Sequence, residues 1–389
     1  MDLKSEARDN INILMSTFSA DRPKALLNYA IKNRNFMDCT ISAGNAERHA
    51  VAAYVLQMYY YATQFSEEIN LEESYQIVSL LMGLEATRTD CWSYGTKLLY
   101  DLKIAGIDLN RDEVAAFLAQ EGTWESNKYN KGKLIEGNAM AVAFYCGNLA
   151  AMYGSLIGNG TVLPGNDADP GIMAKIESCY GNSPMETIEN LLKTFVPAFI
   201  GQENEGVLAS FMAGIRKLGF YMAPASTKYH LSRKEGLAEH TINVFIRHVE
   251  LERPTDMATV GKCILTAVCH DLCKCLFYAP NWARVKVYKE NGQGKFSEPD
   301  GSKSYDWEDA LQYKIDDKMP FGHGRKSLYI ALGYFKGLIT EEIACAIDAH
   351  MADFDQNPMV GYQFIEYPFA LRLHIADMLA SKLDEVING

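Results

Sequence analysis

The chain has 389 residues, of which 48% are hydrophobic and 22% are charged, a composition typical of soluble globular proteins large enough for two domains. Its formal net charge of -12 opposes binding to a phosphate backbone, so long nucleic acids are unlikely default partners. Small anionic substrates are not excluded, because a bound metal ion can supply positive charge locally.

The cysteines and the first residues indicate the compartment. Nine cysteines, an odd number, are spread along the chain, and the sequence opens with MDLKSEARDN rather than with an apolar signal segment. We therefore expect a reduced, cytoplasmic setting. Cys269, Cys273 and Cys275 include no C-x-x-C pair, so we interpret them as small buried side chains rather than as a zinc site.

The N-terminal region, residues 1–165, is predicted to be mostly helical. Apolar periodicity predicts helices over Lys24–Asn33, Ala46–Phe65, Glu73–Leu84 and Asp112–Gln120. The uncharged stretch from Gly137 to Asn166 is interrupted by glycine and asparagine, which favours a buried helix followed by a loop over a membrane span. The region carries no domain signature, and its role is left open, with binding of a protein partner as one possibility.

A loop rich in Gly, Pro, Asn and Asp, Gly158 to Pro170, predicts the boundary to a C-terminal domain over residues 171–389. Helices are expected to resume near Ile172. Ser183 and Glu186 have the spacing of a capping box, with Pro184 at the first helical position, which predicts the next helix. Strand signals prevail only at 285–296, where RVKVYK alternates and NGQG follows, so a β-hairpin is expected within an insertion at 277–320.

Chemistry first enters at CILTAVCHDLCK, predicted as one helix from Cys263 to Lys274. Ile264, Ala267, Val268 and Asp271 share one face of that helix, so an acidic residue ends an apolar stripe. A buried carboxylate needs a cation, hydrogen-bond donors or a metal ion. The neighbouring His270 adds an imidazole, a ligand type that suits first-row divalent ions.

Four more polar residues lie at inward positions of predicted helices or at a helix start. His240 shares a face with Leu237 and Val244, His350 follows Ile343 and Ile347, and Asp377 lies on a small-residue face of the last helix. His323 stands between two glycines where another helix begins. A shared metal ion would satisfy all of these groups together, whereas His248 and His374 are interpreted as ordinary core histidines, His374 with at most an indirect role.

Here the sequence resembles the HD-domain metal-dependent phosphohydrolases. The runs LAEHT, HDLCK, FGHGRKS, DAHM and LHIADMLAS follow the family order H…HD…H…H…D between about Phe211 and Asp384. The resemblance implies that His240, His270, Asp271 and Asp377 are metal ligands, that His323 and His350 match the extra histidines of two-metal members, and that Lys274 matches the family lysine. The long insertion and the absence of an oligonucleotide-binding barrel pattern speak against RNA processing.

The resemblance implies an all-α fold, an HD helical bundle with an inserted β-hairpin. It also implies a phosphohydrolase or phosphodiesterase that acts on a nucleotide or another small phosphoester through a metal-activated water. One or two divalent ions are expected, with Mn, Fe, Co, Ni or Zn favoured over Mg by the imidazole ligands. Asp271 and Lys274 are the candidate catalytic residues, and the candidate substrate-binding residues are Arg325, Lys326, Trp282 and Arg284.

Two alternatives from other classes remain. The same ligand order occurs in HD-fold di-iron oxygenases, which iron content and oxygen consumption would reveal. A non-catalytic interaction protein that retains an HD metal site is the other alternative. The sequence specifies neither the substrate nor the oligomeric state.

Overall fold

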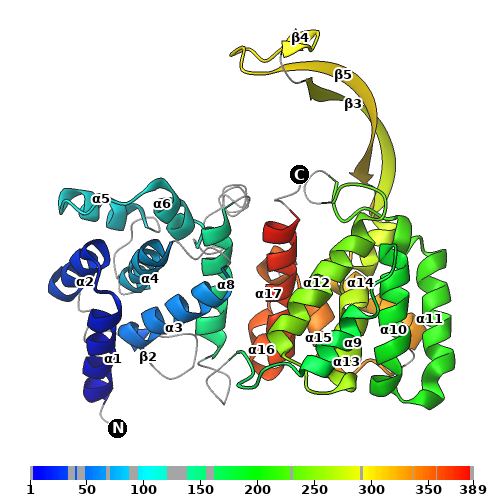
Figure 1. The fold of residues 1–389 in the computed structure, drawn as a ribbon, viewed down its shortest axis with the longest axis horizontal. Coiled ribbons are helices and arrows are strands. Elements are labelled where there is room, and N and C mark those ends of the chain that lie inside the picture. Colours follow the sequence, from blue (N-terminus) through cyan, green and yellow to red (C-terminus); the bar gives the residue numbers. More distant parts are fainter. Residues whose placement is uncertain are drawn as a thin grey trace. The chain divides into compact units, whose positions relative to one another are not determined.

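The computed structural model is mostly helical and divides into two compact units (Figure 1). It describes residues 3–33, 40–41, 49–66, 71–86, 95–120, 138–154, 162–227, 231–289, 292–335, 337–355 and 357–385. The first unit comprises residues 1–167, 250–253 and 349–389, and the second comprises 168–249 and 254–348. The first transition between units, at 167–168, falls inside the predicted boundary loop. Residues 349–389, which we had predicted within the C-terminal domain, group with the first unit.

The first unit is built from helices and one short strand pair. Its elements are α1 (Leu3–Thr17), α2 (Asp21–Asn33), β1 (Thr40–Ile41), β2 (His49–Ala50), α3 (Val51–Gln64), α4 (Glu72–Ala86), α5 (Thr96–Ile104), α6 (Arg111–Leu118), α8 (Ala139–Gly154), η5 (Ala352–Asp355), α16 (Val360–Glu366), α17 (Pro368–Leu379) and the π-helical turn η6 (Ala380–Asp384). The helices predicted in this region are present. One begins later than predicted, because β2 pairs with β1 directly before α3; the predicted positions 46–48 lie outside the described residues.

The first part of the uncharged stretch forms the buried helix α8, as predicted, and the predicted loop after it falls largely outside the described residues. Most of its side chains are buried, including Phe144 and Cys146, so the apolar sequence is accounted for by packing within the unit. Among the described residues, no helix combines the length and the hydropathy that crossing a bilayer would require.

Three segments of the first unit that are distant in sequence meet at Arg372 on α17. Its guanidinium donates to both carboxylate oxygens of Glu252, at 3.2 Å for Nη2 to Oε2, and to the backbone carbonyl of Val162 at 2.6 Å. Both side chains of the ion pair are largely buried. This contact explains why residues 250–253 group with the first unit.

The second unit is a helical bundle that carries the inserted strands. Its elements are α9 (Pro170–Glu177), α10 (Pro184–Ile200), η1 (Gln202–Asn204), α11 (Glu205–Lys217), η2 (Phe220–Met222), α12 (Gly236–Glu252), α13 (Met257–His270), η3 (Leu272–Leu276), β3 (Tyr278–Lys289), β4 (Phe296–Ser297), β5 (Ser304–Ile315), α14 (His323–Phe335) and α15 (Glu341–Ala349). The last residues of α12 and α15 group with the first unit.

Helices α10 and α13 form the centre of this bundle. The predicted cap of α10 is present, since Ser183 Oγ accepts from the backbone N–H of Glu186 at 3.2 Å and Pro184 is the first helical residue. The two helices approach closely at Gly261, where a Cβ atom would lie 2.4 Å from the carbonyl oxygen of Phe195. A larger residue at this position would push α10 away from α13, the helix that ends at His270.

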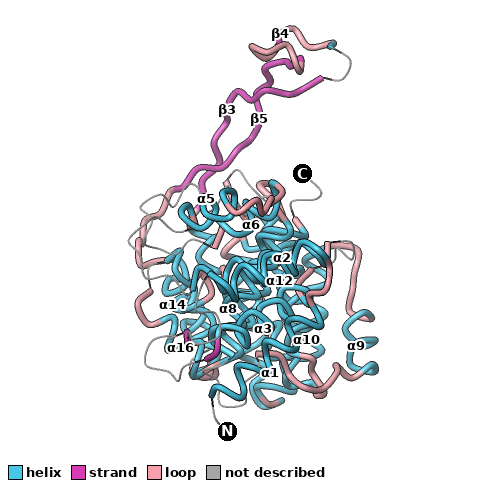
Figure 2. Tube along the Cα trace, turned by 90° about the vertical axis from the view of Figure 1, so that its left-hand side faces the viewer, coloured by secondary structure: helices cyan, strands magenta, loops and turns pink. Residues whose placement is uncertain are grey.

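The insertion forms a long β-hairpin, here called the arm (residues 278–315), which leaves the helices of the second unit (Figures 1 and 2). Strands β3 and β5 pair antiparallel over twelve residues each, from Tyr278 opposite Ile315 to Lys289 opposite Ser304, and β4 pairs with the other edge of β5. The hairpin predicted from the strand signals at 285–296 is present, but its first strand begins seven residues before that stretch and ends at Lys289. Gly292, with φ +71°, lies in the turn region that follows.

Candidate metal centre

The site begins where α13 ends. Asp256 caps the helix start, accepting from the backbone N–H of Thr259 at 2.8 Å. We had predicted one helix from Cys263 to Lys274, but α13 ends at His270. Asp271 leaves helical geometry at φ -115°, ψ 20°, and the 3-10 helix η3 follows. Asp271 therefore lies at the junction between α13 and η3.

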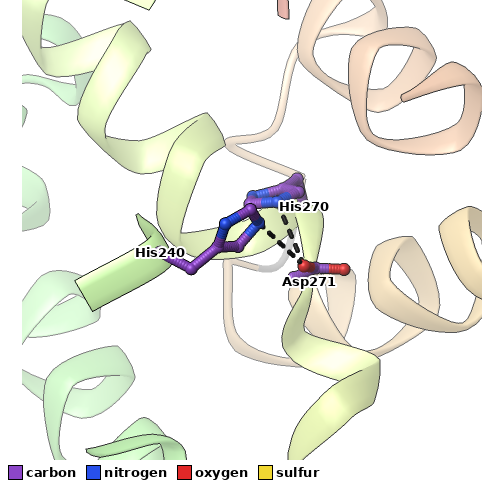
Figure 3. A group of neighbouring side chains, drawn as sticks. All are labelled: His240, His270 and Asp271. Atoms are coloured by element: carbon purple, nitrogen blue, oxygen red, sulfur yellow. Dashed lines mark ion pairs between the residues drawn. The ribbon is translucent and has the colours of Figure 1, made fainter. Parts of the chain in front are cut away.

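Two imidazoles point at this carboxylate (Figure 3). His240 Nε2, from α12, lies 3.4 Å from Asp271 Oδ2, and His270 Nε2 lies 3.2 Å from the same oxygen. The two rings are 5.4 Å apart between centroids. All three side chains are buried, and their ligand atoms lie within 4.8 Å of one another, so this group could hold a metal ion.

The backbone fixes which nitrogen of His270 faces the site. Its Nδ1 lies 2.6 Å from the carbonyl oxygen of Ala267, one turn earlier in α13. A carbonyl oxygen can only accept, so Nδ1 carries the proton in this contact. With the proton held at Nδ1, Nε2 is the nitrogen that the neutral ring would present to a metal ion.

Lys274 supplies positive charge to the same carboxylate. Its ammonium lies 2.5 Å from Asp271 Oδ2, and its side chain is buried in η3. Burial by itself raises the pKa of Asp271, but Lys274, His270 and His240 together outweigh that effect and hold the pKa well below its ordinary value. Asp271 is thus an anion in the protein interior, and Lys274 is a buried ion-pair partner rather than a surface side chain.

The second oxygen of Asp271 faces His323. His323 Nε2 lies 2.7 Å from Oδ1, so the two carboxylate oxygens face different partners. The glycines on either side explain how the ring reaches this position. Gly322 adopts φ +90° directly before α14, and a Cβ at Gly324 would lie 2.4 Å from the carbonyl oxygen of Asp348. The sequence Gly-His-Gly thus allows α14 to begin against the end of α15.

Two supporting residues were not predicted from the sequence. Ser327 Oγ accepts from the backbone N–H of Cys273 at 3.1 Å, which ties η3 to α14. The ring of Phe277 packs edge-on against His323, with 5.7 Å between centroids. Ser327 lies one helical turn after His323, so its spacing was the available signal; nothing in the sequence distinguished Phe277 from other aromatic residues.

The proposed substrate-binding residues lie in different surroundings. Lys326 is buried, its ammonium bound to Asp317 and placed over the ring of Phe277. Arg325 is more exposed, with Nε 3.5 Å from Asp348 Oδ1. Trp282 and Arg284 lie on the arm, about 13 Å and about 20 Å farther along β3 than Tyr278 at the usual rise per residue.

His350 and Asp377 belong to the first unit. Buried His350 directly follows α15, and its carbonyl oxygen lies 2.6 Å from His374 Nδ1 on α17. The other nitrogen of His374 lies 3.2 Å from the Tyr145 hydroxyl. Asp377 is partly buried one turn beyond His374. That His350 and Asp377 are metal ligands stays a prediction from the sequence.

Comparison with protein-family models, with curated proteins and with solved structures found no match to this chain. Among the described cysteines, Cys269, Cys273 and Cys275 are free thiols, the first two buried. Burial raises the pKa of each of these thiols, to about 12 for Cys275, so they are protonated near neutral pH. This agrees with their interpretation as packing residues.

Proposed function

We propose that this chain is a metal-dependent hydrolase of phosphoester bonds, acting on a nucleotide or another small phosphoester. The observation that carries the proposal is the convergence of His240, His270 and His323 on the single buried carboxylate of Asp271. The order of these residues in the sequence, which resembles that of HD-domain phosphohydrolases, supports the same reaction class.

The donor set fits a first-row divalent ion. Ligands held about 2.0–2.2 Å from a tetrahedral ion are separated from one another by roughly 3.3 Å. The separations from Asp271 Oδ2 to His270 Nε2 and His240 Nε2, 3.2 and 3.4 Å, are close to that value. Mixed imidazole and carboxylate ligands favour Mn²⁺, Fe²⁺, Co²⁺, Ni²⁺ or Zn²⁺ over Mg²⁺.

The residues would divide the chemistry between them. When bound, a divalent ion lowers the pKa of a water molecule toward neutrality and neutralises charge on phosphoryl oxygens. Asp271 orients both imidazoles and contributes the negative charge of the site. Lys274, beside the same oxygen, is placed to offset charge that develops on a phosphoryl group. Arg325, exposed at the start of α14, remains the better candidate of the two basic residues there for holding a phosphate, because Lys326 is occupied by Asp317.

The two oxygens of Asp271 suggest a second ion. Oδ2 faces His240 and His270, whereas Oδ1 faces His323, the arrangement expected of a carboxylate that bridges two metals. We propose that His323 belongs to the second metal position. Under this proposal, His323→Gln lowers the metal content by about one ion per chain and leaves the position at His240 and His270 filled.

Metal analysis joined to an activity screen tests the proposal. The chelator-treated protein is reloaded with Mn²⁺ or Zn²⁺, its metal content is measured, and phosphate release is followed over a panel of nucleotides and a small chromogenic phosphodiester. We expect Asp271→Ala and His240→Gln to weaken metal binding at least about 100-fold and to abolish turnover.

A matched control lies on the same helix. His248 is buried on α12, eight residues beyond His240, and is outside the cluster, so His248→Gln should keep both metal and turnover. Full metal content with undiminished turnover in Asp271→Ala would refute the site. Oxygen consumption by the iron-loaded protein, without phosphate release, would favour an oxygenase.

A further inference from the structure

The arm has two faces of different chemistry. Side chains alternate along a strand, and residues opposite one another in the register share a face. One face, here called the apolar face, carries six large side chains that are 38–72% exposed: Trp282, Tyr288, Phe296, Trp307, Leu311 and Ile315. The opposite face carries small and polar residues such as Ala283, Val285 and Ala310. The arm is therefore amphipathic.

The apolar face exposes a large apolar area. Buried aromatic side chains cover about 150–250 Å² each, so at their observed exposures the six residues present on the order of 600 Å². They lie in two groups of three on either side of the Arg284 and Asp309 pair, and together they reach the upper end of the roughly 300–600 Å² that the largest apolar patch of a typical monomer exposes. A standard interface buries about 800 Å² per partner, which this face and its polar edges can supply.

The charges of the arm select the partner. Residues 278–315 contain six Lys or Arg and six Asp or Glu, so the arm is neutral in a chain of net charge -12. Two arms can therefore meet without the net repulsion that opposes contact elsewhere. A nucleic acid would require an excess of basic residues, which this arm lacks.

The centre of the apolar face is self-complementary. Arg284 and Asp309 lie directly opposite each other in the register, with three residue pairs on one side of the same face and two on the other. In a two-fold dimer each copy offers the same patch, so residue i meets residue j and j meets i. A second copy would offer Asp309 to Arg284 and Arg284 to Asp309, while the aromatic side chains on either side pack together.

We infer that the apolar face of the arm is the interface of a homodimer, independently of the proposed hydrolase activity. The aromatic cluster at the far end of the arm supports a preformed surface. Tyr305 is buried there against the rings of Tyr288, Phe296 and Trp307, at centroid distances of 5.7–6.0 Å. The arm therefore already has packed side chains at its far end before a second copy binds.

Sedimentation velocity of the full chain, from about 1 μM to about 100 μM, tests the inference. We expect dimers, and we expect the double variant Trp282→Ser, Leu311→Ser to weaken dimerisation at least about 30-fold. Val285→Thr, on the opposite face of β3, is the matched control and should dimerise as the unaltered protein does. A monomer at about 100 μM, or a double variant that dimerises as well as the control, overturns the inference.

Charge reversal keeps the test valid if the double variant disturbs the arm. Arg284→Asp and Asp309→Arg should each weaken dimerisation, and combining the two in one chain should restore it, because the partner charges are exchanged together. Loss of dimers in the combined variant to the same degree as in the single variants contradicts the two-fold pairing.

Discussion

Both units bury carboxylates among polar partners, and Glu113 in the first unit and Asp271 in the second differ in the kind of partner. In the first unit, Glu113 accepts from the backbone N–H of Asn110 at 2.9 Å, from the Ser74 hydroxyl at 2.7 Å and from Arg22 at 2.7 Å. Asn110 in turn accepts from the Glu113 backbone, which completes a capping box at the start of α6. In the second unit, Asp271 faces three imidazoles and one ammonium.

This difference shows what burial of a carboxylate signifies. The contacts of Glu113 come from the backbone and from groups that keep one charge near neutral pH, and they are contacts that stabilise a fold. The partners of Asp271 are side chains that can lose a proton or bind an ion, and they converge from α12, α13, η3 and α14. Burial alone is therefore a weak sign of function, whereas the kind of partner is a strong one.

The largest effect on stability is expected at Glu113. Glu113→Ala removes three hydrogen bonds from a buried acceptor and half of a capping box, and it should lower the free energy of unfolding by about 2–4 kcal/mol. Urea unfolding followed by circular dichroism measures the change. Glu73, the other and more exposed partner of Arg22, is the control, and Glu73→Ala should cost no more than about 0.5 kcal/mol. Equal losses of unfolding free energy in Glu113→Ala and Glu73→Ala would show that the buried contacts of Glu113 contribute no more than an exposed ion pair.

A metal ion should stabilise only the Asp271 cluster. At a free metal concentration of about 100 times the Kd, the unfolding free energy of the protein should rise by about 2.7 kcal/mol. The same increase is expected in Glu113→Ala, and no more than about 0.4 kcal/mol in His240→Gln, because its Kd is at least about 100-fold higher. The measurement is urea unfolding with and without Mn²⁺ or Zn²⁺. An equal increase in His240→Gln would place the ion elsewhere in the molecule.

The smallest effect concerns an exposed carboxylate, Asp256, at the start of α13. Its pKa is lowered from 3.8, chiefly by the backbone N–H of Thr259. A lowered folded-state pKa gives stability that is present above the unfolded pKa and is lost as the pH falls through the folded value. Asp256→Ala should therefore cost about 1 kcal/mol at pH 7, and the difference should shrink as the pH falls through the lowered folded-state pKa of Asp256.

Asp256→Asn is the control for this prediction. The amide keeps an oxygen that can accept from Thr259 but has no carboxyl proton to titrate, so its stability difference from Asp256→Ala should not depend on pH. The comparison is made by urea unfolding at several pH values. The role of the charge would be contradicted if the unaltered protein kept its full stability advantage over Asp256→Ala at low pH.

The sequence predicted the parts of the site that depend on helix faces. His240 lies on an apolar stripe, and a period of 3.6 residues was sufficient to turn it inward, whereas His270 was selected because it adjoins Asp271. The same reasoning cannot distinguish His240 from His248, since both are buried on α12. Only the order H…HD…H, which is not a helix property, separated the two.

The rest depended on local geometry that periodicity does not encode. The end of α13 at His270 places Asp271 outside the helix, whereas the apolar pattern continues smoothly through Leu272. The start of the first strand of the arm was also missed. Pro280 argues against a strand in the sequence, but β3 is an edge strand of its sheet, where a proline is tolerated. Both features are set by packing partners far away in the sequence.

The chain passes between its two units four times, after residues 167, 249, 253 and 348. This interleaving constrains the order in which the protein can fold during synthesis. The first unit needs α16 and α17, which are synthesised after every residue of the second unit, and Arg372 must then reach Glu252 and Val162. The second unit, whose residues are all made by position 348, can form beforehand. Of the two units, the first is therefore the later to be completed.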